Sequence, residues 1–215
     1  MEPCVTLLTA VMVVTIFILV FAAIFFNASN KRKRWTEIAQ ALGLTHNEGP
    51  FLGVGSIEGE YHGYWVRIDT FTSGSGKNSK TYTRIQTFHN PPLGLGLNIY
   101  REGIFSGFGK MLGFQDIEVG DRQFDDRFTI KGQDEESVIK LLDADVRQQL
   151  MLYDERVGPL NVNDERVYYQ RRGVLTDQAT ITHVLSGQQV VAQRLTRAFT
   201  QNAAQQVYEP AYQVV

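Results

Sequence analysis

The chain has 215 residues, 43% of them hydrophobic, and its 21 Lys and Arg against 23 Asp and Glu give a formal charge of −2. A single cysteine, Cys4, excludes a disulfide within the chain and a cysteine-based metal site. Four cations are consecutive at Lys31–Arg34, so the body that follows carries more acids than bases. Such a body is a poor ligand for the phosphates of nucleic acids.

Residues 1–30 are dominated by an apolar run from Cys4 to Phe26 that contains no charged residue. A helix rises about 1.5 Å per residue, so a helix of this length crosses the roughly 30 Å hydrocarbon core of a bilayer. A helix also pairs its own backbone groups, which lipid cannot do. The run therefore predicts a single membrane-spanning anchor, with the lipid bilayer as its first partner.

Two other interpretations of the run are a cleaved signal peptide and a buried helix of a soluble protein. A signal peptide has a basic start, a shorter apolar core and a small-residue cleavage site. Here Met1-Glu2-Pro3 precedes the run without a cation, and no A-x-A site follows it. These differences favour a retained anchor. Cys4 is then expected to be a buried or interfacial thiol at the outer edge of the anchor, with acylation or disulfide-linked dimerisation as alternatives.

The cations follow the apolar run directly and orient it. Lys and Arg resist translocation, and none precedes the run, so the sequence predicts an N-terminus outside and a cytoplasmic domain at a bacterial cytoplasmic membrane. Clustered cations beside a bilayer also attract anionic lipid head groups. We predict that the membrane interface is formed by Lys31, Arg32, Lys33, Arg34 and Trp35. Core packing is the alternative for Trp35, and a nuclear address or nucleic-acid patch is the alternative for the cations.

Residues 31–44 form a basic juxtamembrane segment that leads into a short amphipathic helix, Trp35–Leu44, ending near Gly43. From Phe51 the apolar period changes to two. This predicts a hairpin that turns at His62-Gly63, followed by further strands, and so an antiparallel sheet. The ranges expected as strands are 55–61, 64–70, 81–88 and 96–101. Residues 104–113 are apolar and glycine-rich, and fit a helix or a packed loop equally well.

The second half of the chain adds helices to this sheet. Asp134 predicts an N-cap for a helix that runs to about Tyr153. A second hairpin is expected over 160–171, and Thr176 is expected to cap a last helix over 177–200. Residues 45–200 then form one α+β domain with two main packed helices, and residues 201–215 are expected to be a flexible tail.

Three groups of residues are candidates for a phosphate, metal or catalytic site. The glycine-rich stretches 73–77 and 107–110 lack the spacing of a phosphate loop. The histidines are scattered without a partner at i+3 or i+4, so no metal and no cofactor is expected. In an acidic cluster, Asp121 and Asp125 are expected to accept backbone N–H groups in turns, with cation binding by the cluster as the alternative. The histidines are His46, His62, His89 and His183. The acidic cluster consists of Asp116, Glu118, Asp121, Asp125 and Asp126.

The stretch FDDRFTIKGQDEESVIKLLDADVRQQLM, Phe124–Met151, resembles a bacterial family of membrane-associated proteins of unknown function. The family pattern is F-[DE]-x-x-F-x-V-x-x-x-D followed by a helix containing Leu-Leu, and Ile130 stands here in place of the valine. In the family a β-rich region with a glycine-tyrosine hairpin precedes this segment, as Gly59–Val66 does here. The resemblance implies a bacterial, membrane-anchored protein and carries no catalytic residues over.

Three functional hypotheses follow. The first is a non-catalytic cytoplasmic interaction or scaffold domain that the anchor holds near an unidentified protein partner at the membrane. The second is a membrane-tethered enzyme whose site uses the acids of Gly120–Asp134. The third is an extracytoplasmic binding domain. Carboxylates that converge in a pocket favour the enzyme, whereas solvated acids that cap turns favour the interaction domain. The oligomeric state is left open.

Overall fold

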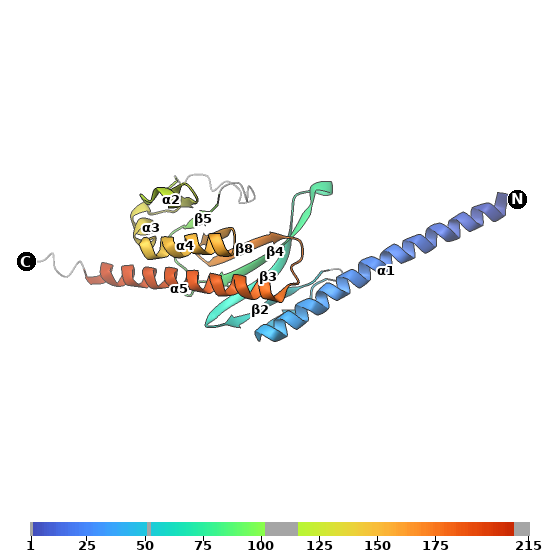
Figure 1. Ribbon diagram of the computed structural model, residues 1–215, viewed down its shortest axis with the longest axis horizontal. Coiled ribbons are helices and arrows are strands. Elements are labelled where there is room, and N and C mark those ends of the chain that lie inside the picture. Colours follow the sequence, from blue (N-terminus) through green and yellow to red (C-terminus); the bar gives the residue numbers. More distant parts are fainter. Residues whose placement is uncertain (1, 51–52, 102–115, 209–215) are drawn as a thin grey trace, which may run out of the picture.

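The computed structural model describes residues 2–50, 53–101 and 116–208, with side chains from residue 11 to residue 204 within these ranges. The fold is α+β, as the sequence predicts: a long apolar helix precedes an eight-stranded antiparallel sheet and further helices. In Figure 1 the first helix leaves the domain at one end, and the last helix ends on the opposite side. The residues 104–113, for which helix and loop were both open, lie outside the described ranges.

The first helix, α1 (Glu2–Leu42), is continuous from the apolar run into the domain. The separate short helix expected over Trp35–Leu44 is therefore wrong as an element, because no break separates it from the anchor. The expected end is correct. Gly43 has φ +69°, and the N–H groups of Gly43 and Leu44 donate to the carbonyls of Gln40 (3.2 Å) and Ala39 (2.8 Å). This is a Schellman cap, whose left-handed position favours glycine.

The sheet is antiparallel throughout, with strand order β1-β2-β3-β4-β8-β7-β5-β6. The expected hairpins are confirmed, and His62 (φ 50°) and Gly63 (φ 83°) form the left-handed turn between β2 and β3. The hairpin of β7 and β8 is inserted between β4 and β5, so neighbours in space are not neighbours in sequence. The strands are β1 (Thr45–Asn47), β2 (Ser56–Tyr61), β3 (Tyr64–Ser73), β4 (Lys80–Phe88), β5 (Asn98–Tyr100), β6 (Thr129–Lys131), β7 (Leu160–Asn163) and β8 (Arg166–Arg172).

The helix expected over 135–153 is two helices, α3 (Glu135–Leu141) and α4 (Ala144–Arg156). Asp143 separates them, because its side chain accepts the N–H of Val146 (2.8 Å) and so starts a new helix. Leu142 turns the chain at this point with ψ 53°. The shorter elements are α2 (Arg122–Asp125) and the 3₁₀ turn η1 (Gly76–Asn78).

The last helix, α5 (Gln178–Tyr208), differs from its expected range at both ends. It is capped by Asp177 and not by Thr176, since the carboxylate of Asp177 accepts the N–H of Thr180 at 2.9 Å. It also continues past residue 200, so the expected flexible tail over 201–215 is wrong up to Tyr208. Residues 209–215 lie outside the described part of the chain.

The core consists of two apolar clusters that share α5. The proximal cluster joins the end of α1, the strands β2–β4 and the start of α5, through residues such as Trp35, Ile68 and Leu185. The distal cluster joins β5–β8 to α2, α3, α4 and the second half of α5. Gln188 lies on α5 between the two clusters, fully buried, and bonds to Thr87 and to the carbonyl of Ile85. Helix α5 therefore joins the proximal and distal clusters into one domain.

We predict that Trp35→Ala lowers the free energy of unfolding of the domain by about 3–5 kcal/mol, because it removes a fully buried indole. The measurement is pulse proteolysis of the full chain in detergent micelles across a urea series. Trp65→Ala is the matched control, since Trp65 is 52% exposed and its removal should shift stability by no more than about 0.5 kcal/mol. Equal losses for the two variants would contradict the burial of Trp35.

Candidate functional site

The membrane-proximal part of α1 contains the four predicted interface cations within a regular helix. Arg32 donates to the carbonyls of Pro50 and Gly53, each at 3.2 Å, and so ties the β1–β2 connection to the helix. Arg34 pairs with Glu37 at 3.1 Å, and its side chain is 68% exposed. Lys33 is exposed and Lys31 is half-buried. Lys33 and Arg34 are therefore exposed to solvent, while Arg32 has a structural role.

Trp35 does not lie at the membrane interface, so this part of the predicted interface set is wrong. Its side chain is fully buried in the proximal cluster, and its indole N–H donates to the carbonyl of Leu175 at 2.8 Å. Core packing, the alternative reading of this residue, is correct. The reason is that the short segment before α5 passes directly over this turn of α1 and supplies an acceptor for the indole.

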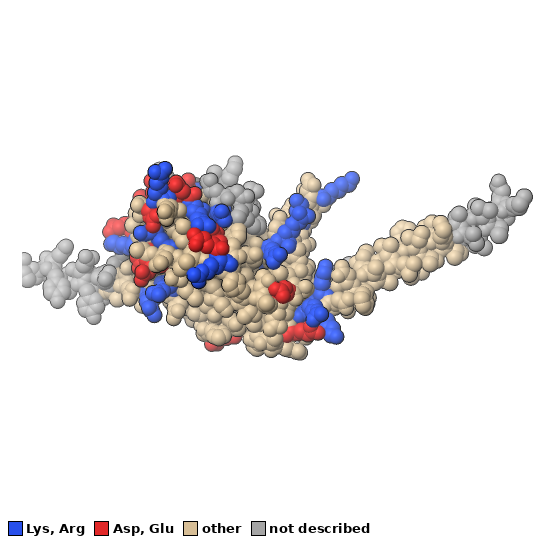
Figure 2. Space-filling view, viewed as in Figure 1, with Lys and Arg blue, Asp and Glu red and all other residues tan. Residues whose placement is uncertain are grey.

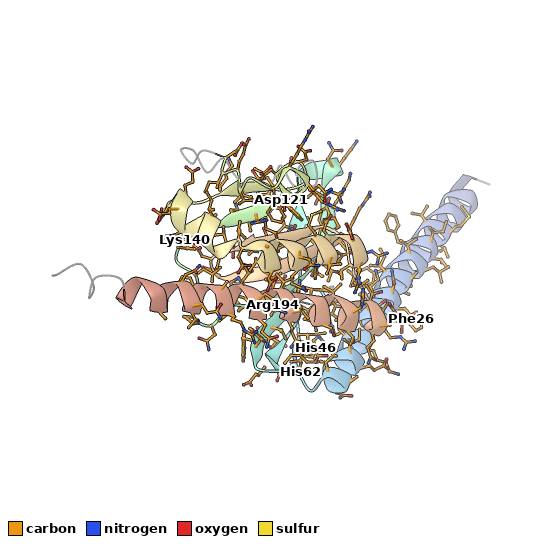
Figure 3. The ribbon with its side chains drawn as sticks, turned by 60° about the vertical axis from the view of Figure 1, so that its left-hand side comes forward. Phe26, His46, His62, Asp121, Lys140 and Arg194 are labelled. Carbon is orange, nitrogen blue, oxygen red and sulfur yellow. The ribbon has the colours of Figure 1, made fainter. Side chains whose placement is uncertain are left out.

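The apolar part of α1 is not covered by the domain, in contrast with the turn of α1 that contains the buried Trp35. It is long and apolar enough to cross a membrane, with 18-residue windows reaching a mean hydropathy of 2.7 and no part of that window buried by the domain. Phe17, Phe21 and Phe25 are spaced four apart along it, and the labelled Phe26 lies where it leaves the domain (Figure 3). About 13 Å of helix separates Phe26 from Trp35. This helix fits a membrane anchor.

The sheet has two chemically different faces. Residues that alternate with Val66, Ile68 and Ile85 along the central strands belong to neither apolar cluster among the described residues. They form what we name the outer face. Its members are Trp65, Arg67, Asp69 and Phe71 on β3, Tyr82, Arg84, Gln86 and Phe88 on β4, and Arg166 and Tyr168 on β8. The described helices contribute to the clusters on the other side, as expected of an antiparallel sheet with one packed face.

A polar network crosses the centre of the outer face from β3 to β8. Arg84 holds Asp69 through two bonds, Nε to Oδ1 at 3.0 Å and Nη2 to Oδ2 at 2.8 Å. Arg67 adds a third contact to the same carboxylate at 3.4 Å. Arg166 donates to Gln86 at 2.8 Å, and Gln86 faces Asp69 at 3.5 Å. Bidentate arginine–carboxylate pairs fix both partners, so this surface is rigid before any ligand arrives.

Aromatic rings alternate with these charges. Phe71 and Tyr82 stack with centroids 5.6 Å apart, and the guanidinium of Arg84 lies 5.3 Å from the Phe71 ring centre. Arg166 lies over Phe88 at 5.7 Å and over Tyr168 at 5.9 Å. Burial raises the pKa of Tyr168, so its phenol stays neutral. Asp69, Gln86 and Tyr168 are buried, whereas Trp65 and Arg67 are exposed. Aromatic residues and arginine are enriched in protein–protein interfaces, which makes the exposed part of this face a candidate partner-binding surface.

The sequence alone does not identify the outer face as a site. The signal was present, because the polar and aromatic residues of β3, β4 and β8 alternate with apolar ones. Alternation identifies a strand, but it does not show that three separated strands place their polar sides together. The register does so, through pairs such as Asp69↔Arg84 and Arg84↔Gln170.

In the acidic cluster, Asp121 and Asp125 have the structural role that the sequence predicts for them. Asp125 accepts the N–H of Val119 at 3.0 Å, and Asp121 accepts the N–H of Phe124 at 3.3 Å and pairs with Arg147 at 3.2 Å. Asp116 pairs with Lys131, Asp126 pairs with Arg122, and Glu118 is exposed. Asp121 lies on the side of the domain away from Phe26 (Figure 3). Within the described ranges, no group of three or more potential metal ligands comes together.

The four histidines lie apart, as expected. His46 contacts the hydroxyl of Thr36 at 2.8 Å and the carbonyl of Val54 at 2.7 Å, and so links β1 to α1. His62 forms the β2–β3 turn, and the stretch 73–77 lies at the tip of the β3–β4 hairpin without a helix behind it. The second glycine-rich stretch, 107–110, and the Cys4 side chain lie outside what the structure describes.

His89 differs from the others, because it is 5% exposed and no described residue provides a hydrogen-bond partner for its ring nitrogens. Burial lowers its pKa to about 4, and the nearby Asn163 backbone and Asp164 carboxylate offset only part of this effect. The ring is therefore neutral in the folded domain at neutral pH.

Comparison with known proteins extends these observations little. No family model and no curated protein matches the chain. Among solved structures, the fold is similar to the crystal structure of the mycobacterial trehalose monomycolate transport factor A, TtfA. The two share 9% sequence identity with a TM-score of 0.48, over 78% of this chain and 93% of that chain. A likeness this distant carries no inference about function.

We predict that acid weakens the domain through His89. The folded-state pKa of His89, about 4, lies below the usual 6.5. The contribution of neutral His89 to the free energy of unfolding is therefore fully present above pH 6.5 and is lost as the pH falls toward 4. The loss is up to about 1.4 kcal/mol per pH unit. Pulse proteolysis of the full chain in urea at pH 7, 6 and 5 measures it. His89→Leu should flatten this profile, whereas His62→Asn, at an exposed turn, should keep it. An unchanged slope in His89→Leu would assign the acid sensitivity to other groups.

Proposed function

We propose that the protein is a single-pass membrane protein whose α+β domain lies on the cytoplasmic side of a bacterial cytoplasmic membrane and acts there as a non-catalytic interaction or scaffold module. The observation that carries the proposal is the continuity of α1. One helix contains the apolar segment, the four cations and the buried Trp35 without a break. The domain therefore cannot swing freely from its anchor, as it would on a flexible linker.

The orientation rests on the distribution of charge along α1. All cations near the apolar segment lie on its domain side, and cations next to a span tend to stay in the cytoplasm. Lys31, Lys33 and Arg34 lie about 7–12 Å along the helix from Phe26, at or just beyond the outer edge of a head-group layer about 5–7 Å deep. Each would gain about 1 kcal/mol from anionic lipid near the surface. The cation run thus combines a topological role with a lipid-binding one.

The interaction role rests on the outer face. Trp65 is a large apolar side chain that the domain leaves 52% exposed, beside the ordered arginine–carboxylate network. Exposed aromatic residues next to preorganised arginines are the usual anchors of protein interfaces. Confinement to the membrane surface raises the effective concentration of such a face toward a membrane protein partner. The turn-capping acids at the far end support this role over an acid-based active site.

We predict a cytoplasmic C-terminus. A reporter that is active on one side of the membrane, fused after Val215, should be active inside, and a second reporter that works only outside should be silent. As a matched test of the cause, Lys31, Arg32, Lys33 and Arg34 are all changed to Gln and cations are inserted after Met1. This variant should shift the population toward the opposite orientation. An outside reporter that is active in the natural sequence would contradict the proposal and favour an extracytoplasmic binding domain.

We predict that a protein partner contacts the outer face. A photo-crosslinking amino acid is placed at Trp65 in the full chain and irradiated in cells. It should yield a discrete adduct that Arg84→Ala weakens, because the loss of Arg84 frees Asp69 and disorders the platform. The same amino acid at the exposed Gln123 of α2 is the control and should not give that adduct. Identical adducts at both positions would show that the outer face has no special role.

A further inference from the structure

The β3–β4 hairpin extends beyond the rest of the sheet as a two-stranded arm. The pairing of β4 with β8 ends at Tyr82↔Arg172, whereas β3 and β4 continue to pair as far as Ser73↔Lys80. The turn η1 closes the tip. We name residues 73–80 the arm. In Figure 1 the arm stands out from the domain toward the side on which the apolar half of α1 leaves it.

The base of the arm is tied to the membrane-proximal turn of α1. The N–H of Gly173 donates to the carbonyl of Thr81 at 2.8 Å, directly below the arm. Two residues further along, the carbonyl of Leu175 accepts the indole N–H of Trp35 at 2.8 Å. The arm and the apolar segment therefore leave the domain from neighbouring points. An anchor that crosses a bilayer here brings the arm close to the same bilayer surface.

The arm and its base are positively charged. Lys77 and Lys80 lie on the arm and Arg171 and Arg172 at the end of β8, and all four are exposed. By the register of β4 and β8, Arg172 shares the sheet face of Lys80, whereas Arg171 lies on the opposite face. No ion pair joins any of them to a carboxylate within the described residues, although Asp177 is close enough to Arg171 to feel its charge. No Asp or Glu stands between Asp69 and Glu102 in the sequence. Figure 2 shows cations without acids at the tip, in contrast to the mixed charges of the far end of the domain.

We propose that this patch, Lys77, Lys80 and Arg172, is a second contact with the anionic lipid surface into which α1 inserts. The inference rests on the proposed function, because it needs the anchor in a bilayer. Charge complementarity and continuity with the cation run of α1 identify the ligand. A membrane surface is within reach of the arm whenever the anchor is inserted, whereas a soluble polyanion would first have to diffuse to it.

The second contact would orient the domain. A single helix fixes the distance of the domain from the bilayer, but rotation about the helix axis remains free. A second point of attachment, away from that axis, stops the rotation. The outer face, which includes Phe71 and Tyr82 at the base of the arm, would then be presented in one direction along the membrane.

The experiment uses the full chain in lipid nanodiscs, with Cys4→Ser and Ser75→Cys labelled by an environment-sensitive fluorophore. Ser75 is exposed and its side chain makes no capping hydrogen bond. The discs carry lipids with spin-labelled head groups, in either neutral phosphatidylcholine or a mixture with phosphatidylglycerol. We expect quenching in the anionic discs, little in the neutral ones, and a decline as salt shortens the screening length.

Lys77→Gln/Lys80→Gln should lower the ratio of docked to undocked arms by up to about 25-fold, since each cation strengthens contact with an anionic surface about fivefold. The matched control, Arg122→Gln/Lys140→Gln, removes two cations from the far end, where Lys140 is labelled in Figure 3, and should leave the quenching unchanged. Quenching that is equal in anionic and neutral discs, or equal in the natural chain and the arm variant, would overturn the inference. A label that is not quenched in any disc would overturn it as well. Failure of the chain to enter the discs would instead overturn the proposed function.

Discussion

The burial of Trp35 is the contact on which the arrangement of the molecule depends. A tryptophan can be fully buried at little polar cost when its N–H finds an acceptor, and here the carbonyl of Leu175 provides one. This single side chain locks the end of the apolar helix to the start of α5 and to the end of β8. Because it does so within a continuous helix, the position of the membrane segment is coupled to the core of the domain.

Helix α5 carries this coupling across the domain. Its first turns belong to the proximal cluster and its later turns to the distal one, with the buried Gln188 between them. Gln188 bonds to β4 through Thr87 and the carbonyl of Ile85, so the junction of the two clusters is polar but satisfied. All this packing occupies one side of the sheet. The other side is consequently available to arginines and aromatic rings, which stabilise one another in the absence of an apolar core.

Charge is organised differently at the two ends of the domain. At the far end, acids and cations form pairs and turn caps, as Asp121 does with Arg147 and Asp125 with the Val119 N–H. Near the anchor, most of the cations project without an acidic partner among the described residues, and Arg32 is instead bonded to backbone carbonyls. Exposed ion pairs contribute little to stability, whereas unpaired cations attract any anionic surface nearby. Among the described residues, the domain therefore has unpaired positive charge on the side of the anchor, whereas the charges of the far end are mostly paired with one another.

The local features of this protein could be predicted from its sequence alone. The apolar span, the alternation of β3 and β4, the His62-Gly63 turn and the capping position of Asp134 all depend on residues within a few positions of one another. The resemblance of Phe124–Met151 to a membrane-associated family stays a prediction. The tertiary structure alone decided that Trp35 is core and not interface, because its partner lies 140 residues away. It also decided that the β7–β8 hairpin enters the sheet beside β4. The length of α5 is a third such feature, because the packing of Ala198 and Phe199 on the distal cluster holds the helix up to the point where it continues past residue 200. The outer face was also decided by the tertiary structure. Alternation shows that a strand has two faces, but only packing determines which face the helices cover.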